Sequence, residues 1–222
     1  MMTNPSTEYP QTISLLSEED YVEDGMTEAG RDLKRCADFF VALFCLIVFA
    51  PLFLICYIAV RLEDDGPAIY KQERIGRYGL PFYIYKFRSM KLNAENDGPQ
   101  LTASEDDNRL TKVGRFLRSH HLDELPQLYN VLIGDMAFIG PRPERKFYID
   151  QIMQRDPRYQ NLYQIRPGVT SYATLYNGYC DTIEKMLRRL DLDLYYLKHR
   201  SWWFDAKILF MTFINIVKGK KF

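Results

Sequence analysis

Two adjacent carboxylates, Asp123 and Glu124, are the side chains of this sequence best placed to do chemistry. Leucines recur at i, i+3 and i+7 from residue 125 to 132, which is typical of one buried helical face, and Gly134 stands where a helix usually ends. The pattern therefore predicts Asp123 as the N-cap of a short helix. Backbone N–H groups and the positive end of the helix dipole favour an ionised carboxylate there and also attract phosphate. This placement suits an anionic nucleophile that acts on an anionic substrate.

Three arginines flank the acid pair in the sequence, namely Arg115, Arg118 and Arg142. Asp is also among the commonest N-cap residues, so Asp123 taken alone is better explained as a simple helix cap. The arginines favour a chemical role, because the guanidinium group is the side chain best shaped to hold phosphate oxygens.

Motifs that hold metals or nucleotides in other proteins are absent from the sequence. The four cysteines and three histidines show no zinc-type spacing. His120 and His121 adjoin the acid pair, which leaves a minor role for them open. The sequence has no Walker-type P-loop and no GxGxxG, so arginines and helix ends would have to hold any nucleotide.

Charge is distributed unevenly along the chain, although the formal net charge is zero. Residues 1–30 carry seven Asp or Glu and no Lys or Arg, so the remainder holds 29 basic against 29 − 7 = 22 acidic side chains, a net charge of +7. This body should attract phosphorylated substrates or an anionic lipid surface. No helix-turn-helix, zinc-finger or RRM-like signature is present, so nucleic acid is not expected as a partner. Residues 1–30 are predicted to form an acidic tail or docking segment outside the core.

A stretch of 22 uncharged residues from Phe39 to Val60 is long enough to cross a bilayer, because a straight helix of that length reaches about 33 Å. Pro51 lies in its middle, where proline kinks a helix. Lys and Arg flank both ends, and the positive-inside rule then places both ends in the cytoplasm. Residues 31–62 are therefore predicted to form a re-entrant membrane helix broken near Pro51. A kinked single span is the alternative.

A second membrane signal lies at residues 202–217, which begin with paired tryptophans and are followed by three lysines. Scattered polar residues in this stretch favour a helix that lies in the membrane interface, so residues 201–222 are predicted to be an interfacial amphipathic helix. A buried amphipathic core helix is the alternative.

Two segments rich in Tyr, Phe and Ile, residues 68–75 and 81–90, flank a glycine-containing turn at 76–80 and are predicted to form a β-hairpin. Lys86 and Arg88 fall two residues apart, so both could hold one anionic ligand from the same strand face. Charges that protect an exposed strand edge are an equally good explanation.

The remainder of the body, within residues 63–200, is predicted to be mainly helical, which gives an α+β fold with a small β-hairpin. Helices are predicted at 111–119, at 144–155 and from Asp181 onward, the last with Glu184 as its capping-box partner, and residues 93–107 are predicted to form a loop. The segment 165–170 is predicted to be a rigid turn that carries Arg166.

Five motifs occur in order along the chain: YKFRSM (Tyr85–Met90), LDELPQL (Leu122–Leu128), GDM (Gly134–Met136), GPRP (Gly140–Pro143) and RPGVT (Arg166–Thr170). Together with the proline-containing apolar segment and the final aromatic helix, they resemble the monotopic phosphoglycosyl transferases, also called bacterial sugar transferases. The resemblance covers residues 31–222. A series of motifs in one order is far more specific than any single motif.

The resemblance implies transfer of a sugar 1-phosphate from a UDP-sugar to polyprenyl (undecaprenyl) phosphate, with release of UMP, at the start of polysaccharide or glycoconjugate synthesis. By match to the family's motif, Asp123 is expected to attack the β-phosphorus and form a phosphosugar-aspartyl intermediate, and Glu124 is expected to bind Mg²⁺. Substrate-binding roles are expected for five cations, Lys86, Arg88, Arg118, Arg142 and Arg166. Of these, Lys86, Arg118 and Arg142 match cationic positions of the family.

The resemblance also implies a place at the bacterial inner (cytoplasmic) membrane, in contact with membrane lipid and with the catalytic domain facing the cytoplasm. The oligomeric state is left open, a homo-oligomer included. Many members continue after RPGVT with a pattern like GxAQVNGR, whereas Tyr179 stands here in the position of the arginine. This departure and the acidic residues 1–30 motivate an alternative function, a non-catalytic membrane scaffold that binds UDP-sugar or recruits later pathway enzymes.

Overall fold

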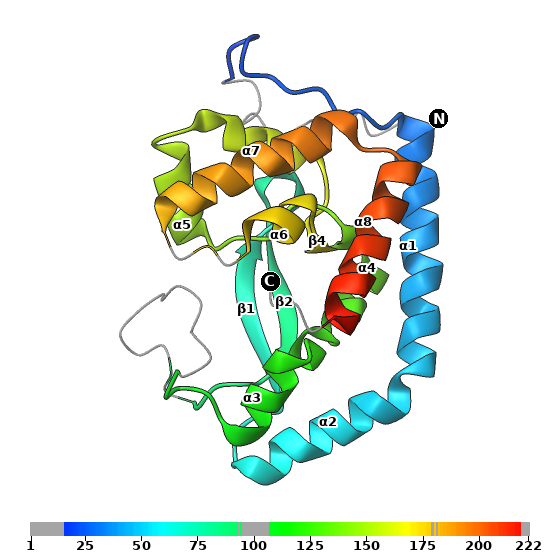
Figure 1. Ribbon diagram of the computed structural model, residues 1–222, viewed down its shortest axis with the longest axis vertical. Helices are drawn as coiled ribbons and strands as arrows, with labels where there is room; N and C mark the ends of the chain where they lie inside the picture. The colour runs from blue at the N-terminus through cyan, green and yellow to red at the C-terminus, as the bar shows by residue number, and fades with distance from the viewer. Residues whose placement is uncertain (1–15, 93, 95–106, 179, 181, 219–222) are drawn as a thin grey trace, which may run out of the picture.

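The computed structural model describes residues 16–92, 94, 107–178, 180 and 182–218 (Figure 1). The elements in chain order, with η for a 3-10 helix, are α1 (Glu28–Val48), α2 (Ala50–Glu63), β1 (Ile69–Ile75), η2 (Arg77–Gly79), β2 (Pro81–Phe87), α3 (Lys112–Ser119), η3 (Leu122–Glu124), α4 (Gln127–Ile133), β3 (Ala137–Ile139), α5 (Lys146–Met153), η4 (Pro157–Gln164), β4 (Gly168–Thr170), α6 (Tyr172–Asn177), α7 (Ile183–His199) and α8 (Trp202–Val217). The predicted loop at 93–107 lies almost entirely outside the described residues, as do Tyr179 and Asp181.

The predicted hairpin is confirmed and lies at the centre of the molecule (Figure 1). Strands β1 and β2 pair antiparallel from Ile69 opposite Phe87 to Ile75 opposite Pro81. The turn between them contains Tyr78 and Gly79, both with positive φ (63° and 71°), a conformation that glycine adopts without strain. The second strand ends at Phe87, three residues before the predicted end.

A second sheet was not predicted from the sequence. Strands β3 and β4 pair parallel, with Ala137 opposite Gly168 and Ile139 opposite Thr170. The predicted turn at 165–170 therefore contains a short strand. The two backbones approach so closely that a side chain at Gly168 would clash with Gly140. Three-residue strands carry too little periodicity to be recognised from sequence.

The predicted break near Pro51 is confirmed, because α1 and α2 meet at an angle of 64°. Pro51 lies in the first turn of α2, where its missing N–H leaves no helical hydrogen bond unmade. Within the described residues, no single helix is both long and apolar enough to cross a membrane; the bent pair α1–α2 meets that criterion only when the two helices are taken together.

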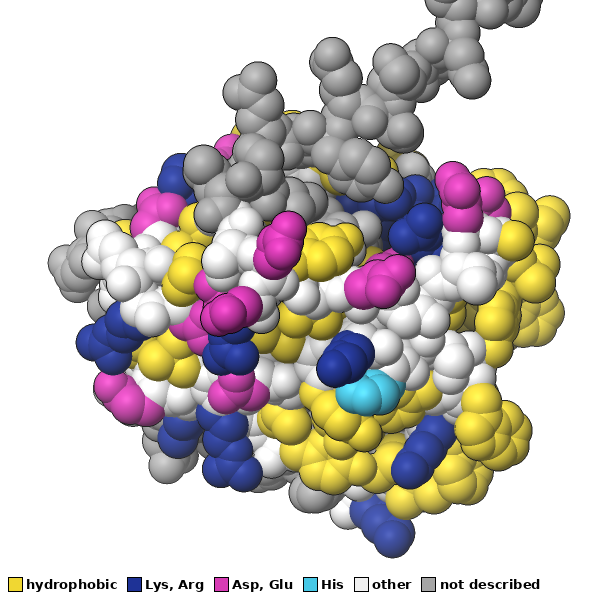
Figure 2. Space-filling model, turned by 90° about the horizontal axis from the view of Figure 1, so that it is seen from above, with side chains coloured by type: hydrophobic (Ala, Val, Ile, Leu, Met, Phe, Trp, Pro, Cys, Tyr) yellow, Lys and Arg dark blue, Asp and Glu magenta, His cyan; other side chains and the backbone are white. Residues whose placement is uncertain are grey.

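Large apolar side chains face outward on α1, α2 and α8. The most exposed are Phe40, Phe44 and Ile47 on α1, Ile55 and Leu62 on α2, and Trp203, Phe210 and Phe213 on α8. In Figure 2, hydrophobic side chains gather on the right-hand side, where α1 and α8 lie in Figure 1. Such a continuous apolar surface is unusual in a protein surrounded by water.

Helices α1 and α8 are joined by buried charges. Lys34 on α1 lies 2.9 Å from Asp205 on α8 and 3.6 Å from Asp38, and all three side chains are nearly inaccessible. The Tyr196 hydroxyl on α7 donates to Asp205 at 2.7 Å. Helix α8 thus buries one face, which includes Ile208, and exposes the other. Helix α8 therefore has one face that packs in the core, as in the alternative of a buried helix, and one exposed apolar face, as expected of an interfacial helix.

Residues 17–27 pack against the body, contrary to the expectation that residues 1–30 stay outside the core. Met26 is buried, and Val22 packs against the main hydrophobic cluster. The Val22 N–H donates to Asn161 at 2.9 Å, and the Gly25 N–H donates to the Leu197 carbonyl on α7 at 3.0 Å. These hydrogen bonds bring the start of α1 to the end of α7.

Helix α4 ends at Gly134 as predicted, with φ at 96°, but its buried face differs from the prediction. The predicted leucines Leu125, Leu128 and Leu132 are only half-buried, whereas Gln127, Asn130 and Val131 are buried. Asn130 is fully inaccessible because its amide joins the helix to β2: it accepts from the Tyr85 N–H at 3.1 Å and donates to the Tyr83 carbonyl at 2.7 Å. A polar residue at the centre of this face broke the apolar pattern.

The start of α7 also differs from the prediction. Thr182 is its N-cap, and the threonine hydroxyl accepts a hydrogen bond from the Lys185 N–H. The helices predicted at 111–119 and 144–155 are confirmed as α3 and α5, with slightly shorter bounds.

We predict that Asn130→Ala lowers the free energy of unfolding by about 2 to 3 kcal/mol, because the Tyr85 N–H and the Tyr83 carbonyl both lose their side-chain partner. Chemical denaturation of the purified protein measures the change. Ile133→Ala on the same helix is the control and should cost less, because Ile133 is already 48% exposed. Equal losses in the two variants would contradict the role given to the Asn130 amide.

Candidate functional site

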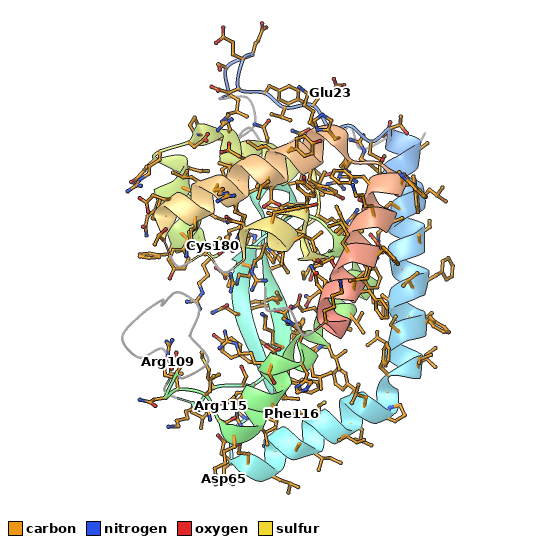
Figure 3. The ribbon with its side chains drawn as sticks, viewed as in Figure 1. Glu23, Asp65, Arg109, Arg115, Phe116 and Cys180 are labelled. Carbon is orange, nitrogen blue, oxygen red and sulfur yellow. The ribbon has the colours of Figure 1, made fainter. Side chains whose placement is uncertain are left out.

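A cavity of about 530 Å³ runs along the β1–β2 hairpin. Among the described residues, ten Lys or Arg side chains line it, against two acids, Asp123 and Glu144. Arg109 and Cys180, both lining residues, are labelled in Figure 3 on the same side of the hairpin, near α3 and near α5 respectively. So strong an excess of cations indicates a site for a multiply charged anion.

The acid pair does not cap the leucine-rich helix. Asp123 and Glu124 form the turn η3, whereas α4 begins at Gln127 after Pro126. His121, which precedes η3, has a left-handed backbone with φ at 55°. The prediction of Asp123 as the N-cap is therefore wrong, because the proline starts the helix and the acids lie one short turn earlier.

Glu124 is held by two of the predicted cations. Lys86 Nζ on β2 lies 2.6 Å from Glu124 Oε1, and Arg142 Nη2 lies 4.0 Å from the same oxygen. Burial alone would raise the pKa of Glu124, but the charges of Lys86 and Arg142 outweigh burial and lower that pKa to about 2. Glu124 is therefore an ionised carboxylate at any physiological pH.

Asp123 behaves in the opposite way. It is 5% exposed, and burial together with the neighbouring charge of Glu124 raises its pKa, although Lys86 and Arg118 oppose the change. The helix-dipole argument predicted that the pKa of Asp123 would be lowered, because it placed Asp123 at the N-terminus of a helix. The environments of the two acids thus push their pKa values apart, a pattern found where two carboxyl groups have different roles. Once deprotonated, a carboxylate of raised pKa is the stronger nucleophile.

Arg118 on α3 is a further cation of this site. Its Nη1 is buried without a hydrogen-bond partner among the described residues, and Arg118 lines the cavity beside Asp123. Its charge also lowers the pKa of Asp123. A phosphate oxygen would satisfy this donor. Arg115, one turn earlier, is exposed and does not line the cavity, so the structure does not bring it to the acid pair (Figure 3).

The segment 141–144 places Arg142 beside the acids. The Pro143 carbonyl accepts from Arg74 Nη1 at 3.0 Å, and the Pro141 carbonyl accepts from the Gly168 N–H at 2.9 Å. The Glu144 carboxylate forms ion pairs with Arg74 and Arg189. The loop is therefore fixed from β1, β4 and α7 at once.

Sequence reasoning missed the residues that hold this loop, Arg74, Glu144 and Arg189. Only Glu144 adjoins a recognised motif, and no local pattern links Arg74 to Arg189, which lies more than one hundred positions later. All three line the cavity.

Of the two remaining predicted cations, Arg88 lies at the cavity and Arg166 does not. Arg88 lines the cavity, although its side chain pairs with Asp64 at the end of α2. Arg166 does not line the cavity: its Nε donates to the Gly134 carbonyl at the end of α4, at 2.8 Å. The structure gives Arg166 a structural contact, and a role in substrate binding stays a prediction for both residues. His120, for which a minor role was left open, is exposed and contacts the Phe116 carbonyl.

Within the described residues, no group of three or more His, Cys, Asp or Glu side chains could hold a metal ion by itself. Mg²⁺ is nevertheless often held by one or two carboxylates together with substrate phosphates. Glu124, whose pKa is lowered to about 2, fits this arrangement together with Asp123, because the substrate phosphates would supply further ligands.

The site thus combines a buried carboxylate of raised pKa, an ionised carboxylate next to it and a cavity rich in cations. This combination is suited to phosphoryl transfer through a carboxylate nucleophile. Residues 29–219 match the family model described as bacterial sugar transferase, and the chain belongs to this family.

Several curated relatives are similar to the chain. A UDP-N-acetylgalactosamine-undecaprenyl-phosphate N-acetylgalactosaminephosphotransferase of Aeromonas hydrophila is 39% identical over 187 residues, 84% of this chain and 44% of the relative. A UDP-glucose:undecaprenyl-phosphate glucose-1-phosphate transferase of Escherichia coli K12 is 41% identical, over 84% of this chain and 40% of the relative. The protein of the same name in Caulobacter vibrioides is 42% identical, over 81% of this chain and 67% of the relative. The chain thus spans less than half the length of the first two relatives.

We predict that Lys86→Met lowers stability at pH 7 by about 3 kcal/mol, because it leaves the half-buried Glu124 carboxylate without its closest cation. The wild type has a depressed Glu124 pKa, so the stability gained from that carboxylate is present above about pH 4.3 and is lost as pH falls toward 2. The difference between variant and wild type should therefore shrink as pH falls from 5 to 2. Thermal unfolding across this pH range measures it.

Lys91→Met is the matched control, since Lys91 also lines the cavity but is exposed. It should change stability little at any pH. A constant difference between Lys86→Met and the wild type from pH 7 to pH 2 would show that Glu124 is not the group affected.

Proposed function

We propose that this protein transfers a sugar 1-phosphate from a UDP-sugar to polyprenyl (undecaprenyl) phosphate through a phosphosugar-aspartyl intermediate, with release of UMP, and thereby starts the synthesis of a polysaccharide or glycoconjugate. The observation that carries the proposal is the buried Asp123, placed beside an ionised Glu124 in a cavity lined by cations. The printed names of the relatives, which specify UDP-sugars and undecaprenyl phosphate, support the same substrate classes.

In the first step, a carboxylate oxygen of Asp123 attacks the β-phosphorus of the UDP-sugar. A bond forms between that oxygen and phosphorus as the bond to the bridging oxygen breaks, and UMP leaves with the electron pair. Lys86, Arg118 and Arg142 lie where they can hold the phosphate oxygens and stabilise the added negative charge. The product is a mixed anhydride between Asp123 and the sugar phosphate.

In the second step, a phosphate oxygen of polyprenyl phosphate attacks the same phosphorus and frees the Asp123 carboxylate. Two substrates of very different polarity can therefore use one cavity in turn. Glu124, with Asp123 next to it, would hold Mg²⁺ together with the substrate phosphates. Bound Mg²⁺ would neutralise negative charge on the phosphoryl group.

A lipid acceptor requires contact with the membrane. The outward apolar side chains of α1, α2 and α8 are suited to that contact, and the bend between α1 and α2 suits a helix that enters and leaves by one face. We therefore propose a re-entrant helix pair in the bacterial inner membrane, with the cavity on the cytoplasmic side.

We predict that the wild type, incubated with Mg²⁺ and UDP-glucose or UDP-N-acetylgalactosamine without lipid, gains the mass of one sugar phosphate in intact mass spectrometry. Asp123→Asn and Asp123→Ala should show no gain, and their turnover with lipid should fall by at least about 1,000-fold, because the nucleophile is missing. Glu124→Gln should form the adduct slowly and with a weaker response to Mg²⁺.

Arg115→Met is the control for loss of a nearby charge and should form the adduct at the wild-type rate. Turnover that survives in Asp123→Ala would exclude the aspartyl intermediate. The scaffold alternative predicts binding of UDP-sugar without any covalent mass gain, so this experiment also distinguishes the two functions.

The re-entrant topology predicts that both ends of the helix pair lie on the same side of the membrane. Ala29, at the start of α1, and Asp65, after the end of α2, are both exposed, and Asp65 is labelled in Figure 3, so Ala29→Cys and Asp65→Cys report on the two ends. In a background with the four native cysteines replaced by alanine, an impermeant maleimide should label both positions from the same side of oriented vesicles. Labelling from opposite sides would establish a single kinked span.

A further inference from the structure

Arg88 is a buried guanidinium whose donors are mostly unpaired. It follows the last residue of β2, is 6% exposed and lines the cavity. Its Nη2 pairs with Asp64, which caps the C-terminal end of α2. Its Nε and Nη1 are buried and have no hydrogen-bond partner among the described residues. Unpaired buried donors are costly and rare in folded proteins, which points to an acceptor supplied by a ligand.

The location of Arg88 separates it from the cations around the acid pair. Lys86, two residues earlier, is already held by Glu124. Two residues along an extended chain span about 7 Å, so Arg88 lies about one phosphate-sized step from Lys86 along the cavity. This step leads toward the end of the hairpin that lies beside α2 and α3 (Figure 1).

One exposed apolar side chain lies close to Arg88. Leu92 lines the same cavity and is 63% exposed. Gly66 contacts both residues, because a side chain there would clash with the Arg88 guanidinium and approach Leu92 Cδ2 to 2.7 Å. A buried cation with two unpaired donors therefore adjoins the exposed apolar side chain of Leu92. A ligand that carries a phosphate on a long apolar chain fits this combination.

We propose that Arg88 binds the phosphate of the polyprenyl phosphate acceptor, in a subsite distinct from the one where Lys86, Arg118 and Arg142 hold the donor phosphates. This inference rests on the proposed function and says where its second substrate, polyprenyl phosphate, binds. The apolar chain would leave along Leu92 and α2, and Asp64 would orient the guanidinium through its ion pair.

The bond changes of the second step show what Arg88 would do. One oxygen of the acceptor phosphate attacks the phosphorus carried by Asp123. A new P–O–P linkage forms as the bond between phosphorus and the Asp123 oxygen breaks, and the carboxylate leaves with the electron pair. Arg88 donates hydrogen bonds to the remaining oxygens of the attacking phosphate and takes no proton. No further reactant is needed.

The two half-reactions provide the test. Adduct formation is followed by intact mass spectrometry with UDP-sugar and Mg²⁺ alone, and adduct loss is followed after addition of undecaprenyl phosphate in detergent micelles. Arg88→Met should form the adduct within about twofold of the wild-type rate. Its adduct loss at low acceptor concentration should slow about 10- to 100-fold, and the KM for undecaprenyl phosphate should rise, because charge-assisted hydrogen bonds to the acceptor are lost.

Two further variants make the result specific. Arg88→Lys keeps one charged donor and should recover part of the adduct loss, which a merely structural role would not predict. Arg115→Met, an exposed arginine on α3 outside the cavity lining, should leave both half-reactions unchanged. Thermal unfolding of each variant verifies that the fold is retained.

Equal slowing of both half-reactions in Arg88→Met would overturn the proposal, because Arg88 would then serve the fold or the donor. Unchanged adduct loss would overturn it as well. A wild type that forms no adduct would refute the proposed function and this inference with it, whereas adduct formation combined with unchanged loss in Arg88→Met refutes the inference alone.

Discussion

The ion pair between Lys86 and Glu124 is the interaction on which the site depends, because it joins the central hairpin to the short turn that carries the acids. Without a cation at this position, two adjacent carboxylates could not both be buried as charges. With it, Glu124 stays ionised and the cost of burial falls on Asp123, whose pKa rises. The same contact therefore positions the pair and divides its electrostatic roles.

Polar contacts of this kind connect every layer around the cavity. Asn130 joins α4 to β2, and Glu144 joins the segment 141–144, which carries Arg142, to β1 and α7. Because each contact is buried and directional, it sets a distance between elements in a way that apolar packing alone does not. The cations that face the cavity are consequently held on a rigid frame, which is what positioning of a phosphoryl group requires.

The sequence was most informative where the signal was local. The hairpin, the break at Pro51 and the proximity of Arg118 and Arg142 to the acid pair could be predicted from short stretches, whereas Lys86 was assigned to the acid pair only through the family resemblance. Contacts between distant segments could not. Arg189 and the parallel pair β3–β4 join residues far apart in sequence, and neither leaves a periodic pattern. The cap assigned to Asp123 failed because Pro126 starts the helix three residues later.

The buried ion pair between Lys34 and Asp205 has a consequence for the order in which the molecule is completed. Lys34 lies near the start of the first helix and Asp205 lies in the last, so 170 residues must be synthesised between them. During translation, Lys34 emerges from the ribosome long before Asp205, with only Asp38 of its two acidic partners beside it. The contact between the first and last helices is therefore a late event in folding.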